Sequence, residues 1–534
     1  MFLSPRSLLL AALLQSVSHV AALTLDIRGE RRMLGATDFS RRADHSEDLQ
    51  NSNNNVDYYT NITLGGQSYS VLIDTGSSDL WVAGSVANAQ DTGKSATVNY
   101  AIGQASGPIK TAPLTFLDYS VSAQAYIQVT PSSSDPQGKG LIGLGPNSGS
   151  HVRETLNSAA GDSVIDSIFR QDKSAPNYLT ILLSRASDPT DKFPGQITIG
   201  EIVPGYENIN NQPKVPVTRL SSRNAGDQHW QVLLDESGII GPDGQPLNVQ
   251  TQVSSTSNKK QLTAIFDSGF TLPQVPKAVS DGIYARIEGA QFQNLSLTGP
   301  IWTIPCDQEV NVTFKIGGAT YPIHPLDTSM DMGQKDSSGK KVCIGSFQTI
   351  TSAEDPDFDI ILGMSFLRNA YMMVNYGDFV DGSTSKADPY VQLLPTTNDT
   401  AEAHSDFVTV RLDGVDKTGE QRLSNTPAPS SDPTPDNTHD DDSPIKSFWE
   451  QHKKVIIIVA SSVGGVLLLA ILACCCCCGR RNKSGPRPAF VPAGFSGPGS
   501  YQQLHEPAPA GEMHQVQGYH PTPGSSYPNP WERR

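Results

Sequence analysis

The chain has 534 residues, more than a single hydrophobic core normally holds, and only 37% of them are hydrophobic. Its formal net charge of −15 at pH 7 argues against a nucleic-acid-binding protein, which needs a basic face, so no nucleic-acid partner is expected. Five of the seven cysteines are consecutive, which leaves no spaced set of Cys and His for a metal site.

The N-terminal residues have the pattern of a cleavable signal peptide. Arg6 precedes the apolar run Leu8–Leu14, and small residues follow at Ala21 and Ala22. Because this apolar run is too short to span a bilayer, we expect residues 1–22 to be removed during secretion.

Two dibasic pairs follow in a polar and charged stretch, residues 23–42. The pairs are Arg31-Arg32 and Arg41-Arg42. This arrangement favours a pro-segment that is cut after Arg42; the alternative is a disordered leader in which the pairs are accidental. Residues 43–55 are expected to continue as a polar leader.

The composition changes over residues 56–395, where short β-branched and aromatic runs alternate with Gly, Pro, Asn and Ser. This pattern is typical of an all-β region with few helices. We divide it into an N-terminal β lobe, residues 56–215, and a C-terminal β lobe, residues 216–395. The best helical candidate is Pro276–Ile287, because Val279 and Ile283 begin an apolar repeat of four residues. The clearest predicted strands are Tyr69–Ile73, Leu114–Leu117, Tyr126–Val129, Tyr178–Leu183, Gln196–Ile199, Ala264–Phe266, Val310–Ile316 and Tyr371–Asn375.

The C-terminal part predicts a membrane anchor. Residues 396–454 are rich in Ser, Thr, Pro and Asp and should form a stalk, because they have too few apolar residues to fold alone. Residues 455–478 carry no charge, and a helix of that length would be about 36 Å long, enough to cross a membrane core of about 30 Å. Arg480 and Arg481 follow directly, which places residues 479–534, a disordered tail, in the cytoplasm.

Asn-X-Ser/Thr sequons on the expected lumenal side predict N-glycosylation. The four candidates are Asn61, Asn294, Asn311 and Asn398.

The strongest signal is a motif that occurs twice, once in each half of the β region. Each copy has an apolar strand, then Asp, a hydroxyl residue and Gly, as in Val71–Ser77 and Ala264–Phe270. The apolar strand carries the carboxylate into the interior, and Gly permits a tight turn or a close backbone approach. The candidate residues are the catalytic Asp74 and Asp267 and the supporting Thr75, Gly76, Ser77, Ser268 and Gly269.

Two such loops brought face to face would place two carboxylates around one water molecule. Like charges at that separation cannot both ionise, so the pair would share a proton over a range of pH. One carboxylate could then act as general base on the water and the other as general acid toward a substrate carbonyl.

At these residues the chain resembles the pepsin-like aspartic endopeptidases, and fungal members most of all. The resemblance covers about residues 56–395 and has several further anchors. Trp81 stands where the family usually has a tryptophan, and Tyr100 stands in the place of the tyrosine of the flap, the hairpin that closes over substrate. The other anchors are Gly140–Gly145, His229–Val232 and Ile360–Gly363.

The resemblance implies a mainly β, bilobal fold with a central cleft, no metal or organic cofactor, and a monomer. It implies hydrolysis of internal peptide bonds in protein or peptide substrates, usually in acid, without a covalent intermediate. It also implies a disulfide between Cys306 and Cys343 and a supporting role for Trp81. The residues expected to contact substrate are Tyr100, Gly103, Phe270 and Thr271.

Three features depart from the family pattern. Phe270 stands where a Ser or Thr normally donates a hydrogen bond to the second aspartate, and losing that bond should raise the pKa of Asp267. The alternative is that Phe270 simply lines the cleft. Met364 replaces a common Asp, and the usual disulfide near the first aspartate is missing.

These features favour a membrane-tethered acid endopeptidase, at the cell surface or in the endosomal and vacuolar system. A second hypothesis is a non-catalytic, peptide-binding or adhesive surface glycoprotein on the same fold, for which the arguments are Phe270 and the unusual flap, where Ala101-Ile102 stand between Tyr100 and Gly103. A third hypothesis assigns the function to the cytoplasmic tail and makes the ectodomain a sensor.

Overall fold

The computed structural model describes residues 46–52, 57–100, 103–171, 176–186, 188–190, 193–295, 299–350, 356–380 and 387–430. The expected signal peptide, pro-segment, membrane helix and cytoplasmic tail lie outside these ranges. Within them, none of the helices has the length and apolar character needed to cross a membrane.

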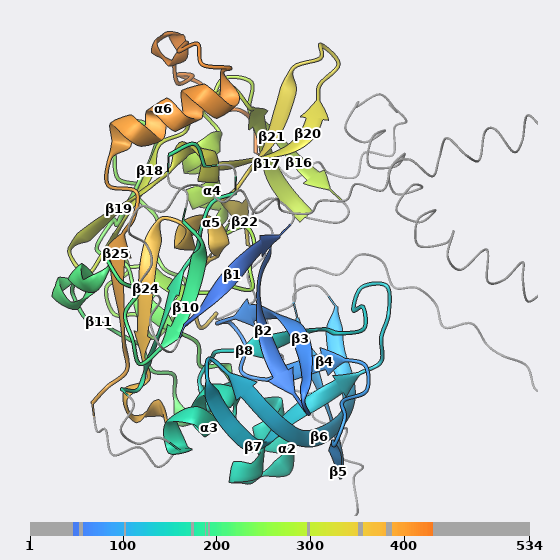
Figure 1. Ribbon diagram of the computed structural model, residues 1–534. Helices are drawn as coiled ribbons and strands as arrows, with labels where there is room; N and C mark the ends of the chain where they lie inside the picture. Colours follow the sequence, from blue (N-terminus) through green and yellow to red (C-terminus); the bar gives the residue numbers. More distant parts are fainter. Residues whose placement is uncertain are drawn as a thin grey trace, which may run out of the picture. The chain divides into compact units, whose positions relative to one another are not determined.

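The described chain is mainly β, as predicted (Figure 1). The first half contains β1 Ser46–Ser52, β2 Asp57–Leu64, β3 Gln67–Asp74, β4 Leu80–Ala83, β5 Gln90–Asn99, β6 Gln104–Phe116, β7 Tyr119–Val129, β8 Lys139–Gly143, α2 His151–Leu156, α3 Val164–Gln171, β9 Tyr178–Leu182, β10 Gly195–Ile199 and β11 Val215–Pro216. The second half contains β12 Gln231–Leu233, β13 Ile239–Ile240, β14 Thr263–Phe266, β15 Gln274–Val275, α4 Lys277–Tyr284, β16 Gln291–Leu295, β17 Gly299–Pro305, β18 Val312–Ile316, β19 Ala319–Ile323, β20 Ser329–Lys335, β21 Lys341–Gly345, β22 Gln348–Thr349, β23 Ile360–Leu362, α5 Met364–Leu367, β24 Ala370–Asn375, β25 Tyr390–Pro395 and α6 Thr400–Arg411.

The largest sheet joins the two halves of the described chain. Its 13 strands run in the order β11-β25-β24-β9-β10-β1-β2-β3-β8-β4-β7-β6-β5. β24 and β25 come from the second half but pair with β9 and β11 of the first. Smaller sheets of the second half are β12-β14-β23-β15-β22, β13-β18-β19 and β16-β17-β21-β20. The shared strands hold the two motif-bearing halves on one support.

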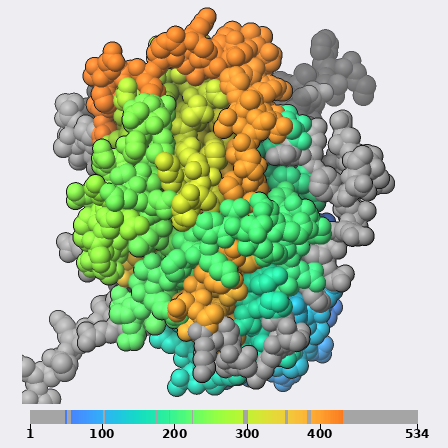
Figure 2. Space-filling model, turned by 90° about the vertical axis from the view of Figure 1, so that its left-hand side faces the viewer, coloured from blue at the N-terminus to red at the C-terminus, as the bar shows by residue number. Residues whose placement is uncertain are grey.

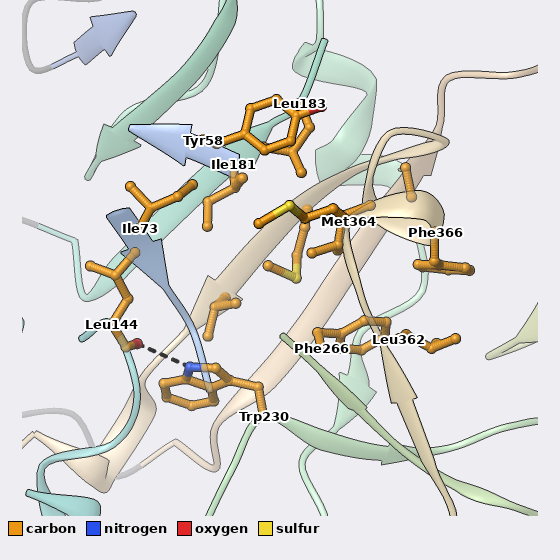
Figure 3. Close-up of a cluster of buried hydrophobic side chains, with 14 of the residues drawn as sticks. Tyr58, Ile73, Leu144, Ile181, Leu183, Trp230, Phe266, Leu362, Met364 and Phe366 are labelled. Atoms are coloured by element: carbon orange, nitrogen blue, oxygen red, sulfur yellow. Dashed lines mark hydrogen bonds between the residues drawn. The ribbon is translucent and has the colours of Figure 1, made fainter. Parts of the chain in front are cut away.

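The two motif strands lie in equivalent surroundings. β3 pairs in parallel with β8, with Asp74 opposite Gly143, and β14 pairs in parallel with β23, with Phe266 opposite Leu362. Parallel strands are usually covered on both faces, which explains their continuous apolar sequences. Ile73, Phe266 and Leu362 are fully buried in the cluster that Figure 3 shows.

Residues 43–55, expected to be a polar leader, include the strand β1, which the sequence did not predict. β1 pairs antiparallel with β10 at one end and with β2 at the other. Leu49 is its buried apolar anchor, so the strand depends mainly on backbone hydrogen bonds, which polar residues make equally well.

The expected stalk would begin at residue 396, but residues 396–430 are folded. Residues 396–430, which we call the C-terminal strap, lie against the second half of the chain and include α6. Asp399 caps α6 by accepting hydrogen bonds from the amides of Ala401 and Glu402, and Phe407 is fully buried. Figure 2 shows these orange residues beside the yellow-green residues of the second half. A few well-placed apolar side chains therefore fold a segment whose average composition is polar.

Backbone hydrogen bonds hold the far end of the strap. The amides of Ser424 and Ala428 donate to the carbonyls of Arg286 and Ala285, over 2.8 and 2.6 Å. These acceptors follow α4, which lies within the predicted helix Pro276–Ile287 and buries Val279 as expected. The strap thus extends over the second half as far as α4.

The expected disulfide between Cys306 and Cys343 is present and joins the end of β17 to β21. Asn294 lies in β16. The side chains of Asn61, Asn311 and Asn398 are exposed, so a glycan would fit at each of these three without disturbing the core.

The contacts of His404 with two carboxylates, which we call the His404 clip, predict that the stability of the docked strap depends on pH. His404 Nδ1 lies 2.9 Å from Glu309 and Nε2 lies 3.3 Å from Asp416, and these hydrogen bonds and charges raise the pKa of His404 above its ordinary value. Because the pKa of His404 is higher in the folded than in the unfolded protein, its protonation stabilises the folded state fully at pH values below the unfolded pKa of about 6.5. This stabilisation is lost as the pH rises through the folded pKa.

His404→Gln should therefore lower the melting temperature at pH 5 but leave it unchanged at pH 9. The expected decrease is about 1–3 °C, because a partly exposed ion pair contributes only about 0.2–1 kcal/mol. Thermal unfolding at both pH values is the measurement. An equal decrease at both would show that the imidazolium charge does not contribute.

Candidate active site

The two Asp-hydroxyl-Gly loops meet face to face. Asp74 ends β3 and Asp267 follows β14, and both are almost fully buried. A Cβ added at Gly76 would lie 2.2 Å from Asp267 Oδ2, and one added at Gly269 would lie 2.6 Å from Asp74 Oδ1. Each glycine therefore packs against the carboxylate of the opposite loop, which leaves no room for a side chain.

Reciprocal hydrogen bonds fix the two loops to each other. Thr75 Oγ1 donates to the carbonyl of Phe266 over 2.8 Å, and Ser268 Oγ donates to that of Ile73 over 3.0 Å. Each hydroxyl also accepts from the backbone amide of the other hydroxyl residue, over 2.9 and 3.1 Å. The hydroxyl residue that follows each aspartate therefore links the loops directly beneath the carboxylates.

The carboxylates have unequal hydrogen-bond partners. Asp74 accepts from Ser77 Oγ over 2.5 Å and from the Gly76 amide over 2.9 Å. Asp267 accepts from the Gly269 amide over 2.7 Å. The second loop carries Phe270 at the position equivalent to Ser77, so it supplies no hydroxyl there.

The pKa values follow this inequality. Burial raises the pKa of Asp74, and the Ser77 hydroxyl and Gly76 amide oppose that rise by stabilising the charged form. Burial and the negative charge of Asp74 together hold the pKa of Asp267 well above its usual range. Ser77 therefore favours the charged form of Asp74, and the negative charge of Asp74 favours the protonated form of Asp267.

Phe270 has a structural role through its backbone. Its carbonyl accepts a hydrogen bond from the amide of Met364 over 2.7 Å, and a Cβ at Gly363 would lie 2.4 Å from that carbonyl oxygen. Met364 is fully buried and Phe270 only partly. The position that often holds an acidic residue in the family is therefore occupied here by an apolar core residue.

Tyr100 lies within reach of this site. Trp81 Nε1 donates to Tyr100 Oη over 2.9 Å, and both side chains are partly buried. Burial and the charges of Asp74 and Asp79 raise the pKa of Tyr100 well above its usual value, so the phenol stays protonated. The amide of Tyr100 donates to the carbonyl of Gly103, whose φ of 81° suits glycine, which closes the turn.

Thr271, the last of the expected substrate contacts, is partly exposed. Its carbonyl accepts a hydrogen bond from Ser365 Oγ over 3.3 Å, so the backbone after the second loop is tied to α5.

Sequence reasoning missed the role of Asp79. Its buried carboxylate accepts from Ser150 Oγ over 2.6 Å and from the amides of His151 and Val152 over 2.9 and 3.1 Å. This carboxylate therefore ties the first Asp-hydroxyl-Gly loop to the start of α2. The one signal in the sequence is the acidic residue in the first motif copy, just before Leu80 and Trp81.

One buried cluster has the residue types of a metal site. Atoms of Asp188, His324 and Asp406 lie within 4.8 Å of one another. However, His324 Nδ1 accepts a hydrogen bond from the amide of Leu326, so the neutral ring carries its proton on Nε2, the nitrogen that faces Asp406. A metal on Nε2 would have to displace that proton and leave an imidazolate, or break the hydrogen bond to Nδ1, so we assign no metal there.

Comparison with known proteins agrees with this geometry. The family model described as eukaryotic aspartyl protease matches residues 57–380, more than half of the chain. Major aspartyl peptidase 1 of Cryptococcus neoformans is 26% identical over 360 residues, which are 63% of this chain and 70% of that protein. Vacuolar protease A of Neurospora crassa is 24% identical over 401 residues, 69% of this chain and 89% of that protein.

Among solved structures, the aspartic proteinase from Irpex lacteus is 20% identical, with a TM-score of 0.47 over 66% of this chain and 98% of that chain. The two motif loops lie inside the range that the family model matches, and the strap lies beyond it. This chain belongs to the eukaryotic aspartyl protease family.

Proposed function

We propose that the protein hydrolyses internal peptide bonds with Asp74 and Asp267 as the catalytic pair. The observation that carries this proposal is the packing of each carboxylate against the glycine of the opposite loop. Two buried carboxylates so close together are costly for stability, and such costs are typical of catalytic sites. The names of the relatives, which are aspartic peptidases and proteases, support the same reaction.

The unequal carboxylates suggest how the reaction is divided. The ionised Asp74 takes a proton from a water molecule while the water oxygen attacks the carbonyl carbon of the substrate peptide bond. The protonated Asp267 donates its proton to the carbonyl oxygen of that bond. The resulting gem-diol collapses when Asp74 donates its new proton to the amide nitrogen, Asp267 takes a proton from a gem-diol hydroxyl, and the C–N bond breaks. Both carboxyl groups recover their starting protonation, and no bond forms between enzyme and substrate.

An extended peptide would lie against the residues around the pair. Tyr100 and Gly103 would cover it from one side, as the flap does in the family. Thr271 and the partly exposed ring of Phe270 would contact it from the other lobe. Trp81 would hold Tyr100 in place through its indole N–H.

The pH range of the activity should follow from the protonation of Asp74 and Asp267. The active form holds one proton, so activity falls in acid when Asp74 is protonated and falls in alkali when the shared proton is lost. Since the pKa of Asp267 lies well above the usual range, we expect activity to extend from acid toward neutral pH.

We further propose that a membrane anchor holds the enzyme in a lumenal or extracellular compartment as a glycosylated monomer made from a longer precursor. The apolar run 455–478 and the N-terminal signal pattern support this, and the relative named vacuolar protease A favours a vacuolar route. The strap is docked as far as Ser430, whose Oγ donates to Asp281 over 2.8 Å, so the proposed stalk would begin after this residue.

The first prediction concerns activity itself. Asp74→Asn should reduce hydrolysis of an unfolded protein by at least about 1,000-fold between pH 3 and pH 7, because the amide cannot act as the base. Wild type and variant should melt at comparable temperatures. Equal activity of the two proteins would exclude the mechanism, and a folded, processed but inactive wild type would favour the peptide-binding or adhesive glycoprotein.

The second prediction concerns Ser77. Ser77→Ala removes a hydrogen bond to the charged form of Asp74, which should raise its pKa and shift the acid limb of kcat/KM to higher pH by about one unit. Ser78→Ala is the control, because Ser78 Oγ donates to the carbonyl of Pro146 instead. The same shift in both variants would contradict the assignment.

The third prediction concerns Phe270. Phe270→Thr should supply the hydroxyl that the second loop lacks and lower the pKa of Asp267, which moves the alkaline limb to lower pH by about one unit. The acid limb should stay in place. Superimposable profiles of wild type and variant would show that Phe270 only lines the substrate site.

A further inference from the structure

A single buried carbonyl of the first half accepts two hydrogen bonds from the second half. Leu144 O accepts from Trp230 Nε1 over 3.1 Å, which Figure 3 shows as a dashed line, and from Tyr376 Oη over 2.6 Å. Leu144, Trp230 and Tyr376 are all buried, so water does not compete for these hydrogen bonds. The side chains of Trp230 and Tyr376, in the second half of the chain, therefore fix the carbonyl group of Leu144 in the first half.

That peptide belongs to a segment that supports the first catalytic loop. The amide of Leu144 donates to the carbonyl of Asp74 over 2.7 Å. The amide of Gly145 donates to the carbonyl of Ser77, also over 2.7 Å. The loop that carries Asp74 and its hydroxyl donor is therefore held by residues whose position depends on Leu144.

Trp230 also supports the second catalytic loop. Its carbonyl accepts from the amide of Phe266, the residue before Asp267, over 3.2 Å. Trp230 thus contacts a neighbour of each aspartate: its indole donates to Leu144, which is hydrogen-bonded to Asp74, and its carbonyl accepts from Phe266, which precedes Asp267.

Aromatic packing fixes the direction of both donors. The rings of Trp230 and Tyr376 meet edge to face with centroids 4.6 Å apart, and Phe169 packs on Tyr376 at 5.3 Å. Burial keeps the pKa of Tyr376 well above its usual value, so its hydroxyl remains a donor across the working pH range.

We propose that Trp230 and Tyr376 are positioning residues, which hold Leu144 and through it the alignment of Asp74 with Asp267. This inference rests on the proposed proteolytic reaction and adds two residues that do not touch the reacting atoms. They should affect catalysis more than substrate binding, because in the proposed complex the peptide would lie against the carboxylates and the flap, whereas Leu144 is fully buried.

Tyr376→Phe tests the proposal because it removes one hydrogen bond and retains the ring. We expect kcat to fall about 5- to 10-fold with KM unchanged, the size that one lost hydrogen bond would produce. The acid limb of the pH profile should also move to higher pH, because Asp74 would be held less firmly against Ser77.

Tyr321→Phe is the matched control. Tyr321 is an equally buried tyrosine of the second half whose hydroxyl donates to a backbone carbonyl, that of Leu393, over 3.1 Å. It should lose similar thermal stability while keeping the wild-type kcat and pH profile. Trp230→Phe provides a second test, with the same expected fall in kcat and shift of the acid limb as Tyr376→Phe.

Three outcomes are separable. A fall in kcat with a shifted acid limb in Tyr376→Phe and Trp230→Phe, but not in Tyr321→Phe, supports the proposal. An active wild type with unchanged kcat and pH limbs in both variants, or equal losses in Tyr321→Phe, overturns it. An inactive, folded wild type would instead defeat the proposed reaction and leave no positioning role to assign.

Discussion

The structure depends on bringing two buried carboxylates together across two loops. Two negative charges on the buried Asp74 and Asp267 would repel each other, so their contact raises the free energy of the fold unless one proton is shared. The interlocked hydroxyls of Thr75 and Ser268 hold the loops in that contact, and glycine is the only residue that fits beside each opposite carboxylate. In the proposed reaction the same unfavourable contact makes one group a base and the other an acid, so the cost of folding and the proposed catalysis have one origin.

The rest of the fold resists separation of the loops. The 13-stranded sheet takes strands from both halves, and the hydrogen bonds to Leu144 O connect the halves again close behind Asp74. Elsewhere the C-terminal strap adds α6 and a clip at His404 to the second half.

The sequence predicts the two Asp-hydroxyl-Gly loops well because the pattern there is local: an apolar strand, an aspartate, a hydroxyl and a glycine must be consecutive. It also predicts α4, whose apolar side recurs every four residues. It fails for β1, where Leu49 is the buried apolar anchor, and for α6, whose polar average conceals the buried Phe407. The capping pattern of Asp399 and Glu402 was the available signal for α6. The roles of Trp230 and Tyr376 could not be predicted, because their acceptor is a backbone carbonyl and any residue could supply one.

The shared proton can be observed directly by NMR of protein labelled with carboxyl-13C aspartate, titrated from pH 2 to pH 9. Comparison with Asp74→Asn and Asp267→Asn would assign the two resonances. The account predicts two coupled steps, the upper one well above the ordinary aspartate pKa of about 3.9, and a single step in each variant. Two independent titrations near that ordinary value would contradict it, because the carboxylates would then not share a proton.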